Sequence, residues 1–452
     1  MSQLEDVFSY VDQRREELLA RLVAYASQPS VSATGEGVAE AAELARQALE
    51  GAGLRARVLE TGGSPVVLGT GPRRPDRLTV LVYGHYDVQP PDPVDAWESP
   101  PFQPTLRNGR LYGRGTGDNK GQHLAQILGM EALRACSGEL PCNVKVLLDG
   151  EEEVGSPNLP AFVDRHRELL AADLVIWSDG PVHESGRWCI TFGVRGIVTF
   201  ELRARGANRP LHSGNWGGVA PNPLWTLVHL LASMKDERGH ITIEGLHDGV
   251  RPLSPAELEV IERLPVDLER VMAGLGVRHL DEPAERGFYE RLVAWPTFTI
   301  NGLHGGYGGP GSQTVLPNEA VAKCDVRLVP DQRAEEVVAR LRAHVLRHAP
   351  GVELVPGGSM EPARTPVDSP YTEPIRRAMT VALGEEPLLV PPLGGSLPIS
   401  VFTRLLGLPT FGVPFANVDQ TNHAPNENLE VERFFAGIRT AASLLTHLAA
   451  MR

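Results

Sequence analysis

The chain has 452 residues, a formal net charge of −13, 42% hydrophobic residues and 22% charged residues. This length exceeds what one small hydrophobic core requires, so we expect two domains. The negative charge disfavours nucleic acid and anionic membrane surfaces as partners, because both are bound by basic protein surfaces.

The cysteine pattern and the N-terminus bear on the compartment. None of the four cysteines forms a C-x-x-C pair, and their spacing does not resemble a disulfide framework; they are Cys136, Cys142, Cys189 and Cys324. A reducing, cytoplasmic setting is therefore expected. The first residues lack a basic region followed by an apolar core, so no signal peptide is predicted. No apolar run reaches the roughly 18 residues that span a membrane.

The first part of the chain alternates helical and strand-like segments. Hydrophobic periodicity predicts helices over residues 4–27 and 37–50. Strands are predicted over residues 55–59, 65–68 and 78–83. This alternation favours an α/β fold, with a mainly parallel sheet covered by helices on both faces.

The third of these strands runs directly into a polar turn, Gly84-His85-Tyr-Asp87. In an open α/β sheet, ligands bind at the carboxyl ends of the strands. His85 there can ligate a metal while Asp87 holds its other ring nitrogen. Taken alone, the motif is more typical of a turn with a hydrogen-bonded histidine.

A long segment rich in turns follows, from residue 89 to residue 120, and a loop of this length in a compact domain is usually functional. It closes with Tyr112-Gly-Arg-Gly-Thr-Gly-Asp118-Asn-Lys-Gly121, before a helix predicted over residues 122–135. A phosphate-binding loop and a plain hairpin are the alternative interpretations. The phosphate-binding loop is set aside because Lys120 is followed by glycine instead of serine or threonine.

Two further buried strands also end in acidic residues. The strand over residues 143–149 leads into Glu151-Glu152-Glu153, and the strand over residues 174–178 stops at Asp179. An acidic run is usually a solvated face or a helix start. Carboxylates at the same sheet edge as His85 are better explained by a common site.

The alternation of predicted strands and helices stops near residue 190 and resumes near residue 363. Between them we expect strands flanking two helices, which indicates a separate α+β layer inserted into the first domain. The predicted division is a catalytic domain over residues 1–189 and 363–452, with an inserted lid and dimerisation domain over residues 190–362. The remaining predicted elements are strands over residues 191–203, 295–300, 320–328, 352–355 and 409–413, and helices over residues 223–235, 334–348, 372–383 and 431–451.

The candidate metal ligands are two histidines and three carboxylates: His85, Asp118, Glu153, Asp179 and His423. Five ligands are too many for one four-coordinate ion, but they suit two ions that share a bridging carboxylate. Such a pair lowers the pKa of a water molecule and polarises a carbonyl group. Glu152 is then available as the general base, which predicts metal-assisted hydrolysis of an amide.

These motifs together resemble the M20 family of metallopeptidases over nearly the whole chain. The motifs are Gly84-His85-Tyr-Asp87, the segment Tyr112–Gly121, Glu152-Glu153-Val-Gly-Ser, Leu211-His212-Ser-Gly and His423-Ala-Pro-Asn-Glu427. The resemblance implies that Asp118 bridges two metals. It assigns His85 and Asp179 to one site, Glu153 and His423 to the other, Asp87 to support of His85, and Glu152 to the general base.

Within that family the chain is most similar to the carnosinase-like dipeptidases. The segments that carry this likeness are Ser312-Gln-Thr314-Val-Leu-Pro, Asp325-Val-Arg327-Leu-Val-Pro and Gly394-Gly-Ser396-Leu-Pro. The resemblance implies that Arg327, Ser396 and Thr314 bind substrate, with Arg327 and Ser396 on its carboxylate. A surface ion pair is the alternative explanation of Arg327. The chain departs from the pattern at Gln313, where Lys is common, and at Pro392-Leu393, where Arg-Glu is usual.

The resemblance also implies a homodimer in which His212 reaches the active site of the partner subunit. The predicted function is hydrolysis of dipeptides or short peptides with a free C-terminal carboxylate. The alternatives are an N-acyl amino acid deacylase or carboxypeptidase of the same family, and a binding protein without catalysis. Two divalent ions per chain are expected, with zinc as first choice and manganese or cobalt as alternatives.

Overall fold

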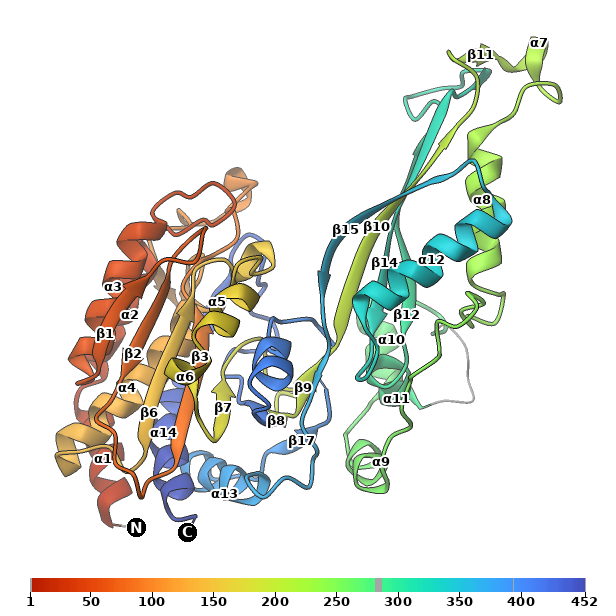
Figure 1. Cartoon of the computed structure of the whole chain (residues 1–452). Coiled ribbons are helices and arrows are strands. Elements are labelled where there is room, and N and C mark those ends of the chain that lie inside the picture. Colours follow the sequence, from red (N-terminus) through yellow and green to blue (C-terminus); the bar gives the residue numbers. More distant parts are fainter. Residues whose placement is uncertain (1, 281–286, 393, 452) are drawn as a thin grey trace.

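The computed structural model describes residues 2–280, 287–392 and 394–451. Figure 1 shows two lobes, each built around its own β-sheet, with long strands running between them. Both chain ends belong to the larger lobe. The smaller lobe therefore interrupts the larger one along the sequence.

Eight strands form the sheet of the larger lobe, in the order β1-β2-β6-β3-β7-β18-β8-β17. The pairs β6–β3, β3–β7, β7–β18 and β8–β17 are parallel, and the other three pairs are antiparallel. The predicted α/β class with a mainly parallel sheet is confirmed. The strands are β1 (Arg55–Leu59), β2 (Val66–Thr70), β3 (Thr79–His85), β6 (Asn143–Asp149), β7 (Leu174–Trp177), β8 (Cys189–Thr191), β17 (Leu388–Val390) and β18 (Thr410–Gly412).

Helices cover both faces of this sheet. Successive side chains of a strand point to opposite faces, and both faces are apolar. Val80 and Val82 of β3 belong to the core beneath the helices on one face. Leu81 and Tyr83 belong to a second core on the opposite face. The helices of the first face are α1 (Ser2–Gln13), α2 (Arg15–Ser27), α3 (Val38–Gly51), α4 (Lys120–Ser137), α13 (Thr372–Leu383) and α14 (Val431–Ala449), and α5 (Leu159–Arg165) and α6 (Arg167–Leu170) lie on the other.

The single helix predicted over residues 4–27 is wrong, since α1 and α2 are separate helices. Arg14 between them has φ −114° and ψ 19°, outside the helical region. Val11 and Leu18, on either side of the break, are both buried in the same core. The hydrophobic period therefore continues across the break, which hides it from sequence reading.

The smaller lobe has a four-stranded antiparallel sheet in the order β12-β14-β10-β15. Its strands are β10 (Gly196–Arg205), β12 (Thr297–Gly305), β14 (Glu319–Leu328) and β15 (Glu353–Met360). Helices α8 (Pro223–Met234) and α12 (Ala334–His348) pack on one face and bury its apolar residues. Strands β12 and β15 extend beyond the predicted 295–300 and 352–355.

The section between α8 and β12 contains helices that are absent from the predicted elements. They are α9 (Pro255–Glu262), α10 (Leu268–Leu275) and α11 (Phe288–Val293). Helix α9 begins with a capping box, in which Ser254 and Glu257 satisfy each other's backbone N–H groups. The Ser-x-x-Glu spacing is a sequence signal for this helix start.

Several short elements complete the chain. The turn-rich segment of residues 89–120 holds the hairpin of β4 and β5, which β19 joins as a third strand. After the glycine turn at residues 394 and 395, the chain forms a single π-helical turn, η3 (Val401–Leu405). None of the helices that the structure describes is long and apolar enough to cross a membrane. The short elements are η1 (Val94–Ala96), β4 (Thr105–Arg107), β5 (Arg110–Tyr112), η2 (Glu152–Val154), β9 (Gly193–Val194), β11 (Leu211–His212), α7 (Ser213–Trp216), β13 (Val315–Leu316), β16 (Ala363–Arg364) and β19 (Asn428–Glu430).

Candidate metal centre

The carboxyl ends of three adjacent parallel strands bring the candidate ligands to one edge of the larger sheet. His85 is the last residue of β3, and Asp179 follows β7 by two residues. The turn after β6 carries Glu152 and Glu153 in η2. Because β3 lies between β6 and β7, these side chains converge.

The first candidate ligand set is His85, Asp118 and Asp179, all buried. Nε2 of His85 lies 3.1 Å from Oδ1 of Asp118 and 3.3 Å from Oδ2 of Asp179. One ligand atom from each of the three residues lies within 4.8 Å of the others. This spacing suits coordination of one small cation.

The second set shares Asp118 with the first and adds Glu153 and His423. Nε2 of His423 lies 3.1 Å from Oδ2 of Asp118 and 3.0 Å from Oε2 of Glu153. The two oxygens of Asp118 thus face different histidines. This is the geometry that a bridging carboxylate requires, and the structure brings all five predicted ligands together.

Asp87 links the first histidine to the acidic turn. Its Oδ1 lies 3.3 Å from Nδ1 of His85. Its two oxygens also accept the backbone N–H groups of Glu152 and Glu153, at 3.1 and 3.0 Å. A buried carboxylate with these partners orients the His85 ring and fixes the turn that carries Glu152.

A second buried carboxylate, Glu427, holds the loop that ends at Asp118. Oε2 accepts from Nη1 of Arg114 at 2.7 Å and from the N–H of Gly115 at 3.0 Å. Oε1 accepts from the N–H groups of Gly117 and Asp118, at 3.0 and 2.9 Å. Burial raises the pKa of Glu427 above its usual value, and the charge of Arg114 opposes this shift. The four donors around the carboxyl group stabilise its ionised form.

The charges of the site favour cations. Burial raises the pKa of Glu153 to about 7 and raises that of Asp179 as well, and the charge of Asp118 adds to both shifts. Burial also raises the pKa of Glu152 well above its usual value. Hydrogen bonds to Asp118 and then Glu153 raise the pKa of His423 to about 10. Burial is the largest cause of the three carboxyl shifts and neighbouring carboxylates add to each, so cations at this site would stabilise the ionised forms.

The residues present therefore fit two divalent cations. Oδ2 of Asp179 is buried and has no well-aligned hydrogen bond from the described residues, although Nε2 of His85 lies 3.3 Å away. Imidazole nitrogens and carboxylate oxygens are ligands that zinc, manganese and cobalt accept. The individual ligand roles remain predictions.

The predicted substrate residues Arg327 and Ser396 also meet in the structure. Arg327 lies on β14 and donates from Nη1 to Oγ of Ser396 at 2.9 Å. Nε of Arg327 lies 3.7 Å from Oδ1 of Asp325, so its charge is only loosely paired. Arg327 thus contacts the turn after β17 in the larger lobe, where the two lobes meet.

His212 and Thr314 lie elsewhere within the same chain. His212 ends β11, which pairs with β13, and its Nε2 lies 3.4 Å from Oγ1 of Thr314. Both side chains are exposed. Figure 1 shows β11 at the tip of the smaller lobe, away from the sheet edge that carries the candidate ligands. The structure of one chain therefore does not join His212 to the metal centre.

Sequence reasoning missed several residues that support the site. The quoted motifs contain Glu427 and Arg114, but the sequence pattern alone indicates no role for either. Sequence reasoning also missed Gln89, whose amide donates to Oε2 of Glu153 at 3.0 Å. Asn422 likewise donates to Oδ2 of Asp118 at 3.1 Å. The only available signal was their position beside ligands in the same turns.

Comparison with known proteins agrees with this geometry. The profile of the Peptidase_M20 family, described as peptidase family M20/M25/M40, matches residues 81–447. The human Beta-Ala-His dipeptidase is 28% identical, over 99% of this chain and 93% of its own length. The Cys-Gly metallodipeptidase of Schizosaccharomyces pombe is also 28% identical, over 99% of both chains.

A solved structure extends the likeness to three dimensions. The M20 family metallo-carboxypeptidase Sso-CP2 from Sulfolobus solfataricus has a TM-score of 0.90 and 33% sequence identity. The match covers 96% of this chain and 100% of that one. Both lobes are therefore shared with this relative.

Proposed function

This chain belongs to peptidase family M20/M25/M40, and from that premise we propose that it is a metallo-dipeptidase for substrates with a free C-terminal carboxylate. The observation that carries the proposal is the pair of ligand sets sharing Asp118, next to the buried Glu152. The dipeptidase names of its relatives support the reaction, hydrolysis of a single peptide bond.

Two divalent cations would be held by His85, Asp118 and Asp179 and by Asp118, Glu153 and His423. When bound, they supply Lewis-acid polarisation of the scissile carbonyl and make water a stronger nucleophile near neutral pH. We propose zinc as the first choice, with manganese or cobalt as alternatives that the same ligands accept.

Glu152 is the proposed general base. Its carboxyl group is buried, and burial raises its pKa well above the usual value, so it has an increased affinity for a proton. Asp87 holds the backbone N–H of Glu152 and faces Nδ1 of His85. That contact favours the tautomer of His85 with its proton on Nδ1. The unprotonated Nε2 then faces Asp118 and Asp179.

Arg327 and Ser396 are proposed to bind the C-terminal carboxylate of the substrate. A guanidinium group offers a planar pair of donors that match a carboxylate, and the hydroxyl group adds a third donor. Their mutual contact at 2.9 Å places these donors together.

We propose that two chains form a homodimer through the smaller lobe, and that His212 and Thr314 serve the partner's site. Strand β12 is at the edge of its sheet and exposes Ile300 and Leu303, so its backbone can pair with another strand. Helix α8 next to it exposes Trp225. His212 would then donate to the oxyanion that forms when water attacks the carbonyl.

The domain division at residues 190 and 362 and a cytoplasmic location also remain proposals. The first is supported by the two separate sheets, because the smaller sheet is built from residues 196–360. The second is supported by the cysteines, which are all unpaired.

A carboxypeptidase is the second candidate function, favoured by the likeness to the Sulfolobus solfataricus metallo-carboxypeptidase. Both enzymes would use the same metals. Substrates with a blocked amino group separate them, because a carboxypeptidase accepts them and a dipeptidase requires the free amine.

The test is an assay of the purified chain on β-Ala-His, Cys-Gly and their N-acetylated forms, with chelator and then with each metal restored. We expect hydrolysis of the free dipeptides that chelation abolishes and metal restores. Glu152→Gln should keep its metals and lose about 10²–10⁴ in kcat. A metal-loaded parent that cleaves only the acetylated forms would overturn the dipeptidase assignment.

A further inference from the structure

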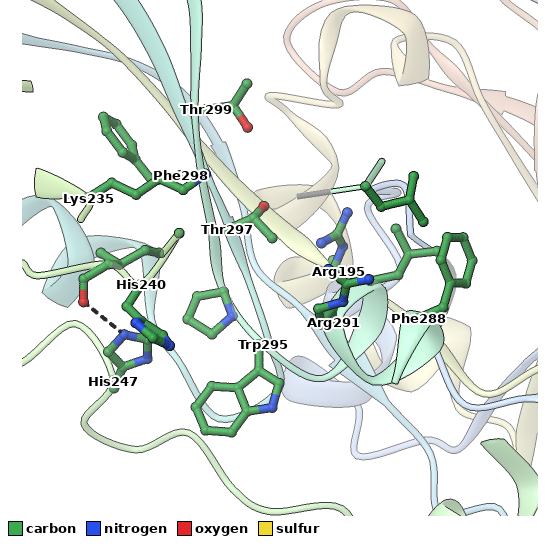
Figure 2. A pocket seen from close by; sticks show the side chains of 15 residues that line it. Arg195, Lys235, His240, His247, Phe288, Arg291, Trp295, Thr297, Phe298 and Thr299 are labelled. Carbon is green, nitrogen blue, oxygen red and sulfur yellow. Dashed lines mark hydrogen bonds between the residues drawn. The ribbon is translucent and has the colours of Figure 1, made fainter. Parts of the chain in front are cut away.

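A cavity of about 620 Å³ lies beside the edge strand β12 of the smaller lobe. Figure 2 shows Arg195 and Arg291 on one side of it and Lys235 and His240 on the other. The aromatic rings of Phe288 and Trp295 form part of its wall. No proposed metal ligand lines this cavity, so it is separate from the metal centre.

The lining is basic although the whole chain carries a net charge of −13. Its positively charged residues are Arg195, Lys235 and Arg291; His240 also lines it but lies 3.2 Å from Oδ2 of Asp236. No aspartate or glutamate occurs among the described lining residues. A cavity of this charge in an acidic protein favours an anionic group.

Arg195 is the residue whose bonding is incomplete. Arg195 is only 7% exposed. Nε donates to the carbonyl oxygen of Gly394 at 2.8 Å, but Nη1 is buried without an acceptor among the described residues. Burial and then the charge of Arg327 lower the pKa of Arg195 to about 10, with Asp325 opposing. A buried guanidinium donor without an acceptor is costly, and an anionic ligand would supply the acceptor.

The same short turn connects the cavity to the proposed carboxylate site. Arg195 holds Gly394 through its side chain and Gly395 through its backbone N–H. Two residues on from Gly394, Ser396 accepts from Arg327. Thr297 lines the cavity and pairs with Arg327 across β12 and β14. A substrate residue whose carboxylate is on Arg327 would therefore have the cavity within reach of its side chain.

We propose that this cavity binds the side chain of the substrate's C-terminal residue and selects one that ends in a carboxylate, glutamate above all. The inference rests on the proposed function and adds a substrate preference to it. The α-carboxylate would pair with Arg327, and the side-chain carboxylate with Nη1 of Arg195. The aromatic and aliphatic walls at Phe288 and Leu292 would cover the methylene groups.

The experiment compares Ala-Glu with Ala-Gln, which have nearly the same shape but differ in charge. For the metal-loaded parent we expect kcat/KM to be at least about tenfold higher for Ala-Glu, because a charge-assisted bond replaces a neutral one. Arg195→Gln keeps a donor for Gly394 and removes the charge. It should bring the ratio of the two kcat/KM values to within about twofold of one.

Two further variants guard against misfolding of Arg195→Gln. Lys235→Gln, at a partly exposed position, should lower the ratio about twofold through loss of one partly screened cavity charge. Lys323→Gln is the matched control, since Lys323 is exposed on β14 and does not line this cavity. It should leave the ratio unchanged.

The outcomes separate the two levels of the proposal. If the parent cleaves both dipeptides with equal kcat/KM, the cavity inference is overturned and the dipeptidase assignment stands. If Arg195→Gln is folded and keeps the parent ratio, the inference is also overturned. If the metal-loaded parent cleaves neither dipeptide, the proposed function fails and the cavity preference fails with it.

Discussion

Glu427→Gln is expected to destabilise the protein and to weaken its metal binding, although Glu427 is not a proposed ligand. The side chains of Arg114 and Glu427 are 1% and 0% exposed, and their charged atoms lie 2.7 Å apart. Removing one charge of such a pair leaves the other buried without compensation, at a cost of about 3–5 kcal/mol. Glutamine has only one acceptor oxygen. Two of the four N–H donors that now bind the Glu427 carboxylate would therefore face the NH₂ group of the glutamine.

The loop that ends at Asp118 explains the expected effect on metal binding. One of those donors is the backbone N–H of Asp118, the shared ligand of both sets. Loss of a supporting bond to a ligand typically weakens metal binding by about 10- to 100-fold. We therefore expect a loss of about 3 kcal/mol or more in the free energy of unfolding, together with weaker binding of both metals.

The assay is urea unfolding of the metal-free proteins, followed by metal titration of each folded variant. The double variant Arg114→Gln with Glu427→Gln should be more stable than Glu427→Gln alone, because neither charge is then left unpaired. Asp12→Asn is the matched control, since it removes a carboxylate that is 54% exposed from an ion pair with Arg439. It should change the free energy of unfolding by less than about 0.5 kcal/mol. If Glu427→Gln unfolded within about 1 kcal/mol of the parent, the reasoning from the buried pair would be refuted.

Further variants test three of the remaining roles. Asp118→Ala should lose both metals in elemental analysis, whereas Asp179→Ala should lose one; a tightly bound ion left in Asp118→Ala would contradict the bridging role. Arg327→Lys should lower kcat/KM at least about tenfold because the planar fork is lost, and the parent should cleave C-terminally amidated dipeptides poorly; equal rates for free and amidated dipeptides would contradict this assignment. His212→Ala should lose about 10²–10³ in kcat with its metals kept. When it is mixed with inactive Glu152→Ala chains, about a quarter of parent activity should return through mixed dimers, and no recovery despite proven subunit exchange would remove the role in the partner's site.

Much of the local structure could be predicted because it depends on neighbouring residues. The predicted bounds of α12, α13 and β6 agree with the structure, since each has a clear helical or strand pattern between turn residues. The candidate ligands could also be predicted, because His85 ends one buried strand and Asp179 follows another, and the carboxyl ends of these strands share one sheet edge. The grouping of all five ligands around Asp118, however, came from family resemblance and not from periodicity.

Contacts between distant parts of the chain decided the rest. Glu427 meets the N–H of Asp118 across 309 positions of sequence, and Arg327 meets Ser396 across 69. No local pattern encodes such a pairing, because it depends on how both lobes pack. The same holds for the missing acceptor at Arg195, which arises only where β12, α11 and the turn at Gly394 close around its side chain. The amino-acid sequence thus determined which chemical groups the chain carries. Only burial and packing in the folded chain decided which charged groups are left to bind metal and substrate.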